Sequence, residues 1–178
     1  MCDMCEGKSL EEVLIDERVK VEQFGWMVQA VGYAESYDGR LPWMYTVGLA
    51  ASRGHPELVV FGLSIGSAHH LIQDVVAGIE QGVHYSVGDT LPHHGLLVRF
   101  GAVHPSRFRS TDLFSGWLGY YERWGDEPDR SALQVVLPSD GFCACHRQPN
   151  LSLPASPVGR NVGPPARARR RRNRHHPG

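Results

Sequence analysis

The chain has 178 residues, of which 42% are hydrophobic and 21% charged, and its formal net charge at pH 7 is −1. These values are typical of a globular domain and exclude a chain that is disordered throughout. No stretch reaches the roughly 18–20 uncharged apolar residues of a membrane-spanning helix. The acidic start Met1-Cys2-Asp3-Met4-Cys5-Glu6 lacks the apolar core of a secretory signal. We therefore expect a soluble, cytoplasmic protein with no membrane partner.

Charge is unevenly distributed along the chain. Residues 1–140 hold all 19 acidic residues and ten basic ones, a formal charge of −9, whereas residues 141–178 hold eight arginines and no acid. Six of the 12 prolines also lie after residue 140, and large apolar side chains are almost absent after Leu153. Such a composition cannot bury enough apolar surface to offset the entropy lost on folding. The sequence predicts one globular domain over residues 1–144 and a disordered, Arg/Pro-rich basic tail over residues 145–178.

The arginine run Arg169–Arg172 in this tail has two interpretations. It is either a solvated charge run or an arm that contacts nucleic-acid phosphates without sequence specificity. No aromatic residue lies between the arginines, so the tail offers no platform for base stacking. The abrupt change of composition after Gly141 also fits GC-rich DNA translated out of frame, and the sequence leaves these alternatives open.

The sequence of the first part of the domain predicts a helix followed by two strands. Ser9-Leu10-Glu11-Glu12 has the pattern of a capping box and Gly25 suits a helix end, which together predict an amphipathic helix over residues 10–24. Residues 26–31 and 43–49 are rich in aromatic and β-branched side chains, which favours two strands. Because a single loop joins them, we expect these strands to pair antiparallel.

The rest of the domain adds two helices and three strands. After a loop over residues 50–56, the apolar run 57–63 predicts a buried central strand, and the apolar stripe over 67–81 predicts a helix. The remaining predicted segments are a loop over 88–95, a strand over 96–103, a helix over 111–124 and a strand over 133–137. The order α-β-β-β-α-β-α-β predicts an α+β domain with a mixed or mostly antiparallel sheet of about five strands and three helices.

The four cysteines form two pairs, Cys2 with Cys5 and Cys143 with Cys145, and the second pair precedes His146. The thiolates of a Cys-x-x-Cys pair can share a tetrahedral zinc ion, and the second pair can complete such a site. The first pair lies at a chain terminus, however, where fraying is the rule. We favour reduced thiols with no shared role, and therefore no cofactor. A structural zinc site and a redox pair are the alternatives.

Two further motifs invite an enzymatic interpretation. The ten histidines show no metal-binding spacing such as His-x-x-x-His, so we interpret them as surface or hydrogen-bonded side chains. Gly62-Leu63-Ser64-Ile65-Gly66 matches the nucleophile elbow of α/β-hydrolases, which needs an acid and a histidine downstream. The chain lacks the repeated strand–helix units of those enzymes, so a helix-start turn is the favoured interpretation of Ser64.

Polar and aromatic side chains gather around the predicted end of the second strand. Tyr45 and Thr46 place hydroxyls on opposite faces of the strand, so one of them is buried and needs a partner. The short loop that follows places Glu57 near the Gly48 end, where a backbone amide or His55 is its nearest partner. The sequence predicts the polar rim of a pocket here, with a hydrogen-bonded strand end as the alternative. The candidate ligand-binding residues are Trp43, Tyr45, Thr46, His55 and Glu57.

These motifs together resemble the bacterial domain-of-unknown-function 4262 family over about residues 1–141. The residues that carry the resemblance are Cys2-x-x-Cys5, Gly25-Trp26 with Val28, Trp43 with Tyr45–Leu49, His55–Val60, Gly62-Leu63, Leu133–Val136 and Pro138–Gly141. The chain departs from the family pattern at Leu137 and at Phe142–Cys145, so the second cysteine pair is peculiar to this chain. The resemblance implies no activity that can be transferred.

No complete acid–base or nucleophilic constellation accompanies these motifs. The sequence therefore predicts a domain that binds a protein partner or a small ligand at the strand-end rim, and not an enzyme. The alternative is a hydrolase that uses Ser64 or a site made by His55 and Glu57. The oligomeric state is left open.

Overall fold

A computed structural model describes residues 7, 9–32, 41–109, 113–124, 130–138 and 148–154. The elements in chain order are α1 (Leu10–Phe24), β1 (Met27–Val31), β2 (Trp43–Val47), α2 (Leu49–Arg53), β3 (Glu57–Phe61), α3 (Ile65–Glu80), β4 (Thr90–His93), β5 (Leu96–Ala102), the 3-10 helix η2 (Pro105–Arg109), α4 (Ser115–Trp124) and β6 (Ala132–Val136). The predicted α+β class is confirmed, with six strands and four α-helices among the described residues in place of about five and three.

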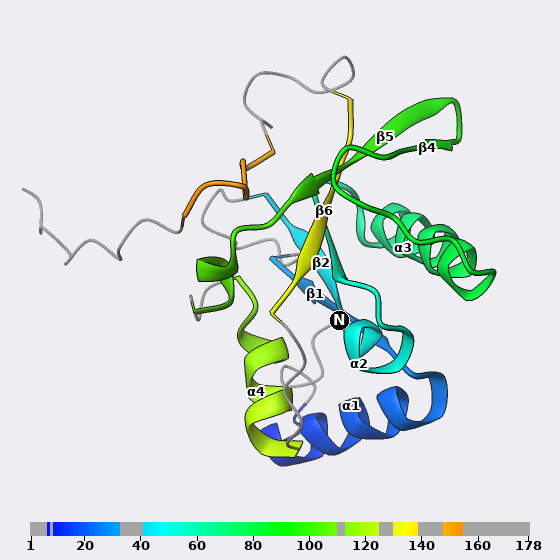
Figure 1. The fold of residues 1–178 in the computed structure, drawn as a ribbon. Coiled ribbons are helices and arrows are strands. Elements are labelled where there is room, and N and C mark those ends of the chain that lie inside the picture. The colour runs from blue at the N-terminus through cyan, green and yellow to red at the C-terminus, as the bar shows by residue number, and fades with distance from the viewer. Residues whose placement is uncertain are drawn as a thin grey trace, which may run out of the picture.

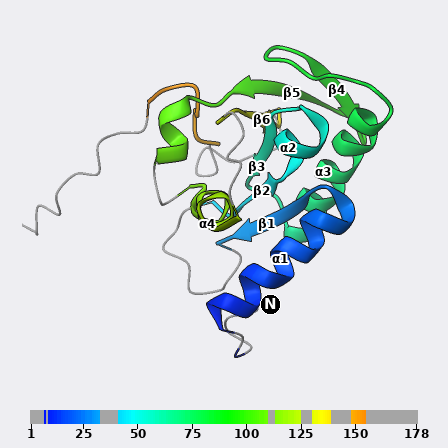
Figure 2. The same cartoon turned by 60° about the horizontal axis from the view of Figure 1, so that its bottom comes forward.

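The strands form one mixed sheet in the order β1-β2-β3-β6-β5-β4. Only β3 and β6 pair in parallel, and the other neighbours are antiparallel, including the predicted β1–β2 hairpin. Helix α3 covers one face of the sheet, whereas α1 and α4 lie on the other (Figures 1 and 2). The sheet therefore has an apolar core on each face.

The alternation of side chains along the central strands divides these two cores. Met44 and Val60 pack with the buried stripe of α3, which includes Leu71. Tyr45 belongs to the second core, with the aromatic side chains of α4 such as Trp117. All five residues of β3 are buried, as the predicted central strand requires.

Two elements of the structure differ from the prediction. Residues 50–56 were expected to form a loop, but α2 begins directly after Gly48, whose φ of 99° turns the chain out of β2. Residues 88–95 were also expected to form a loop, but Thr90–His93 is the edge strand β4. Its Pro92 weakens a strand pattern in sequence and is tolerated only because β4 has one unpaired side.

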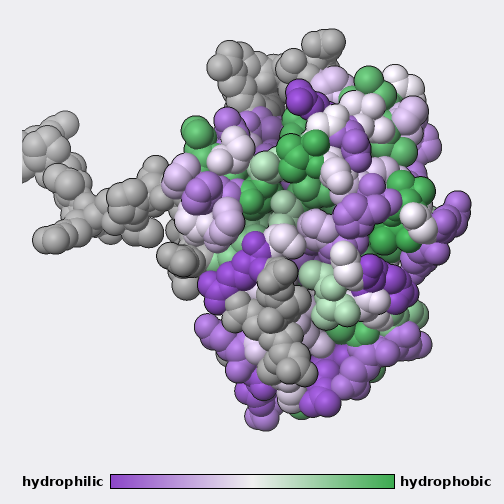
Figure 3. Space-filling model, in the orientation of Figure 1, coloured by the Kyte–Doolittle hydropathy of each residue, from purple (hydrophilic) through white to green (hydrophobic). Residues whose placement is uncertain are grey.

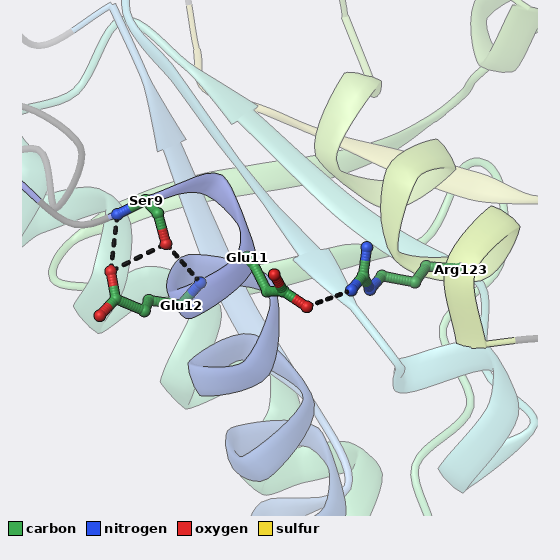
Figure 4. A network of polar contacts seen from close by, with 4 residues as sticks. All are labelled: Ser9, Glu11, Glu12 and Arg123. Atoms are coloured by element: carbon green, nitrogen blue, oxygen red, sulfur yellow. Dashed lines mark hydrogen bonds and ion pairs between the residues drawn. The ribbon is translucent and has the colours of Figure 1, made fainter.

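Helix α1 begins and ends as its sequence pattern indicates. Ser9 Oγ accepts a hydrogen bond from the Glu12 amide at 3.2 Å, and Glu12 Oε2 accepts one from the Ser9 amide at 2.8 Å (Figure 4). Gly25 closes the helix with a φ of 82°. Glu11 forms an ion pair with Arg123 at 3.1 Å, which joins α1 to α4 (Figure 4).

Part of the segment that composition predicts to be a tail packs against the domain. The tail was predicted to begin at residue 145, yet Leu151 is buried in the core on the α4 face. Its carbonyl accepts a hydrogen bond from the His104 amide at 2.8 Å, and Gln134 Nε2 donates to the Pro149 carbonyl at 2.9 Å. Residues 148–154 are therefore part of the folded unit. The arginine run of the tail lies outside the described residues.

We expect the Leu151→Ala substitution to lower the free energy of unfolding by about 2–5 kcal/mol, the cost of truncating a buried leucine. Leu153→Ala is the matched control, because Leu153 is 58% exposed. Denaturant unfolding of both variants measures the difference. Equal midpoints would show that residues 148–154 do not belong to the core.

None of the helices in the described parts of the chain combines the length and apolar character needed to cross a bilayer. On the face drawn in Figure 3, hydrophobic residues are interspersed with hydrophilic ones. This mixture is ordinary for a protein surface in water.

Candidate functional site

The carboxylate of Glu57 lies at the first turn of α2 and is completely buried. Its Oε1 accepts hydrogen bonds from the amides of Gly48 at 3.0 Å and Ala50 at 3.3 Å, and its Oε2 accepts one from the Leu49 amide at 3.3 Å. Gly48 has no side chain with which to cap the helix. Glu57, from the following strand, therefore supplies the acceptors that the first amides of a helix need.

Thr46 completes this arrangement between the ends of β2 and β3. Its hydroxyl donates to Glu57 Oε2 at 2.6 Å and accepts from the Leu58 amide at 2.8 Å. The backbone register of the two strands runs only from Trp43 with Phe61 to Tyr45 with Val59. Beyond that point the threonine hydroxyl takes the place of a backbone carbonyl. Glu57 thus lies at the end of the sheet where the loop length placed it.

Gly48 is also the point at which α1 touches this turn. A Cβ atom at residue 48 would lie 2.8 Å from the Gly25 carbonyl oxygen and 2.9 Å from Val21 Cγ1. Only glycine combines this close approach with a φ of 99°. We call the set Thr46, Gly48 and Glu57 the strand-end junction.

The electrostatics of the junction reflect its burial. Burial raises the pKa of Glu57, while the hydrogen bonds from Thr46 and from the amides at the start of α2 act in the opposite direction. Among the described residues, the hydrogen bonds to the Glu57 carboxylate come from one hydroxyl and three backbone amides, and none comes from a cationic side chain. The negative charge of the ionised form is therefore held by neutral donors alone.

Tyr121 of α4 lies beside this carboxylate. Burial raises the pKa of its hydroxyl, and the nearby Glu57 raises it further. Among the described residues the buried Tyr121 hydroxyl has no hydrogen-bond partner, and the nearby Gly48 amide donates to Glu57 Oε1.

Tyr45 lies in a different network, on the face of the sheet covered by α4. Its hydroxyl is hydrogen-bonded to Gln29 Oε1 and accepts from the Gly116 amide at 3.0 Å, at the start of α4. Gln29 Nε2 in turn donates to Glu17 Oε1 of α1 at 2.5 Å. Burial raises the pKa of Tyr45. This chain of hydrogen bonds joins β2, β1 and both helices on this face.

His55 lies just before β3 and is 1% exposed. Its Nε2 accepts a hydrogen bond from the Tyr85 amide at 3.2 Å, and its Nδ1 lies 2.8 Å from the Pro56 carbonyl. An acceptor at Nε2 and a donor at Nδ1 define the neutral ring. Burial lowers the pKa of His55, and the neighbouring His84 lowers it further.

We expect His55 to make the domain less stable in mild acid. The unfolded chain takes up a proton near pH 6.5, whereas the folded ring does so only at a lower pH. Stability is therefore unaffected above this pH and falls below it, by at most about 1.4 kcal/mol per pH unit. The His55→Gln variant can donate and accept but does not titrate. Its unfolding free energy, measured between pH 5 and 8, should lack this slope, and an unchanged slope would contradict the assignment.

The Ser64 hydroxyl is used in a helix cap. It accepts a hydrogen bond from the Ser67 amide at 3.2 Å and donates to Ser67 Oγ at 2.9 Å. This geometry agrees with the helix-start interpretation, although α3 begins two residues earlier than the predicted helix. In the described part of the chain, the Ser64 hydroxyl is hydrogen-bonded to Ser67 and not to a histidine.

The five side chains predicted to line a rim do not share one contact network among the described residues. Thr46 and Glu57 are joined directly, but Tyr45 bonds toward α4 and His55 toward Tyr85. Trp43 donates from Nε1 to the Leu113 carbonyl at 3.1 Å. All five are at most 4% exposed, so they lie inside the domain and not on an open rim. The cysteine pairs, Cys2 with Cys5 and Cys143 with Cys145, lie outside the described residues.

Sequence reasoning missed a row of polar atoms on α4. The indole nitrogens of Trp117 and Trp124 and the Tyr121 hydroxyl are buried and have no hydrogen-bond partner in the part of the chain that the structure describes. Their spacing of four and three residues places them on one face of the helix. The aromatic spacing predicted a helix and a core, but which hydrogen bonds remain unmade depends on the packed structure.

Comparisons with known proteins place the chain in a family. The model of the family described as "Domain of unknown function (DUF4262)" matches residues 20–142. This segment contains the strand-end junction and α4, whereas Cys2 and Cys5 precede it. The comparison with curated proteins and the comparison with solved structures found no match. The matched segment covers more than half of the chain, which therefore belongs to the DUF4262 family.

Proposed function

We propose that this domain binds a small molecule that carries hydrogen-bond acceptors, such as a carboxylate or an amide. In this proposal the ligand contacts the face of α4 that bears Trp117, Tyr121 and Trp124. The observation that carries the proposal is the presence of three buried donors without partners on this face, among the residues that the structure describes.

A buried donor without an acceptor costs about 1–3 kcal/mol, and folded domains contain few such groups. Three such donors on one face of a helix destabilise the ligand-free domain, and no interaction within it offsets this loss among the described residues. A ligand with carbonyl or carboxylate oxygens would supply the missing acceptors. Trp124 is the member of this face nearest to solvent, because its side chain is only half-buried whereas Trp117 and Tyr121 are buried.

Two cationic side chains beside Trp124 favour the same class of ligand. The guanidinium carbon of Arg18 lies 4.5 Å from the centre of the Trp124 ring, and that of Arg123 lies 5.2 Å away. Arg18 also forms an ion pair with Glu22, and Arg123 with Glu11. Both pairs are exposed to solvent, so either guanidinium can exchange its carboxylate for the negative or strongly polar oxygens of a ligand. The buried carboxylate of Glu57 has its own donors and does not compete for the cations.

Ligand binding agrees with the hydrogen bonds of Ser64 and Glu57 better than hydrolysis does. The Ser64 hydroxyl caps α3, and the four donors around Glu57 occupy the lone pairs that a general base would need. Recognition of a protein partner is the other alternative from the sequence. No comparable set of unpartnered groups among the described residues supports it.

The test is a nuclear magnetic resonance titration of the ¹⁵N-labelled protein with benzamide and benzoate, with toluene as the acceptor-free control. We expect the two acceptor-bearing compounds to shift the indole N–H signals of Trp117 and Trp124. The indole signal of Trp43 should stay in place, because its N–H already donates to Leu113.

Two matched substitutions complete the test. Trp117→Phe removes an unpartnered indole N–H and should weaken the binding of benzamide and benzoate, whereas Trp43→Phe removes a partnered one and should not. Equal responses to the acceptor-bearing compounds and to toluene, or binding that survives Trp117→Phe unchanged, would contradict the proposal.

A further inference from the structure

Asp74, His93 and His94 form a cluster of metal-ligating side chains away from α4. Each offers one ligand atom, and these atoms all lie within 4.8 Å of one another. Asp74 Oδ2 and His93 Nδ1 are 3.1 Å apart, and the two imidazole rings have centroids 4.5 Å apart. The cluster joins the middle of α3 to the β4–β5 hairpin, two elements that are otherwise held together by apolar packing.

The hairpin positions both histidines. β4 pairs with β5 up to His93 opposite Leu96, so His94 and Gly95 alone form the turn. Both have positive φ, 47° and 80°, as a type I′ turn requires. Among the described residues His94 is the only non-glycine residue with a positive φ. The turn thus holds the His94 ring against that of His93 in a conformation that histidine seldom adopts.

Helix α3 supplies the third group. Asp74 precedes Val75 and Val76, which are buried against the sheet, and this packing fixes the turn of helix that carries the carboxylate. His93 alternates along β4 with Pro92 and points to the same side as Leu91, which packs on the core that α3 covers. The carboxylate and the imidazole therefore face each other across the interface between helix and hairpin.

The distances suit a small divalent cation. Zinc–nitrogen and zinc–carboxylate bonds are about 2.0–2.2 Å long, so two ligand atoms at a tetrahedral ion lie about 3.4 Å apart. The separation of 3.1 Å between Asp74 and His93 is already close to this value. The ligand atom of His94, at the exposed end of the hairpin, lies within 4.8 Å of the other two.

We propose that Asp74, His93 and His94 bind a divalent first-row transition metal ion such as Zn²⁺. Two imidazole nitrogens and a carboxylate oxygen are ligands that such ions prefer, and three protein ligands leave one tetrahedral position for water. Asp74 and His94 are exposed, so the ion can enter directly from solvent. This site is independent of the cysteine pairs and of the ligand proposed for α4.

The test uses the full-length chain with its four cysteines changed to serine, so that thiolates do not compete for the metal. Calorimetric titration with zinc chloride at neutral pH should show one ion bound per chain. Asp74→Asn, His93→Gln and His94→Asn should each weaken binding by more than the roughly 10- to 100-fold that loss of an outer-shell partner costs. Asparagine at residue 94 keeps a side chain that tolerates positive φ.

His69→Gln is the matched control, because His69 lies on α3 but outside the cluster. It should leave the zinc affinity unchanged. Zinc should also raise the melting temperature of the cysteine-free protein and of the His69→Gln variant, but not that of His94→Asn. Absence of stoichiometric binding, or an affinity that is the same in the His94→Asn and His69→Gln variants, would overturn the proposal.

Discussion

Replacing Glu57 with leucine is expected to lower the free energy of unfolding by about 4 kcal/mol or more. The substitution leaves four buried donors without an acceptor, namely the Thr46 hydroxyl and the three amides at the start of α2. Each such donor costs about 1–3 kcal/mol. A loss of this size is a large fraction of the 5–15 kcal/mol by which domains of ordinary stability stay folded.

The matched control for this prediction is Glu80→Leu. Glu80 is an exposed residue of α3 whose ion pair with Arg53, at 3.3 Å, is partly solvated. Surface pairs of this kind contribute about 0–1 kcal/mol. Denaturant unfolding of both variants compares the two losses. If Glu57→Leu unfolds at the same denaturant concentration as Glu80→Leu, Glu57 does not hold the junction together.

Replacing Gly48 with alanine is expected to cost about 3 kcal/mol or more. The added methyl group would lie 2.8 Å from the backbone oxygen of Gly25, which cannot move without displacing the end of α1. Overpacking of this kind costs about 1–3 kcal/mol. The φ of 99° adds strain of about 1–3 kcal/mol for a residue with a Cβ atom.

Gly54 provides the control at the other end of α2. It also has a positive φ, 62°, but a Cβ atom there would meet no atom within 4 Å. Gly54→Ala therefore carries only the backbone cost, about 1–2 kcal/mol. Thermal unfolding of the two variants separates strain from close approach. Equal melting temperatures would mean that α1 does not press against residue 48.

The sequence predicted the parts of the fold that local patterns determine. The capping box at Ser9 and the glycine at residue 25 define α1, and the apolar run of β3 identifies a strand buried on both faces. Helix α2 escaped prediction because its N-cap is a glycine and its acceptors come from Glu57, in the next strand. A cap supplied from a distant residue leaves no local pattern.

The candidate site was predicted only in part, for a similar reason. Thr46 and Glu57 are brought together as the loop length indicated, and the partners of Glu57 are backbone amides as expected. The sequence predicted that the strand over 57–63 is buried and that one of Tyr45 and Thr46 is buried. The structure buries both of these residues and places all five candidate residues inside the domain. His93 and His94 were interpreted, like the other histidines, as surface or hydrogen-bonded side chains, because only the packing of α3 on the hairpin brings Asp74 to them.

Composition alone did not predict that residues 148–154 pack against the domain. Charge and proline content identify a segment that is poor in apolar residues, but a single leucine is enough to dock seven residues when a buried side chain provides hydrogen bonds. Gln134 does so here, by donating to the Pro149 carbonyl and accepting from the Leu151 amide at 3.4 Å.

The central claim is that the buried carboxylate of Glu57 organises the strand-end junction by capping α2. Hydrogen exchange of the Gly48, Leu49 and Ala50 amides in the native protein tests it most directly. These amides should exchange as slowly as the core amide of Val59, through global unfolding only. Fast exchange at all three positions while Val59 stays protected would contradict it, because it would show that the carboxylate does not hold these amides.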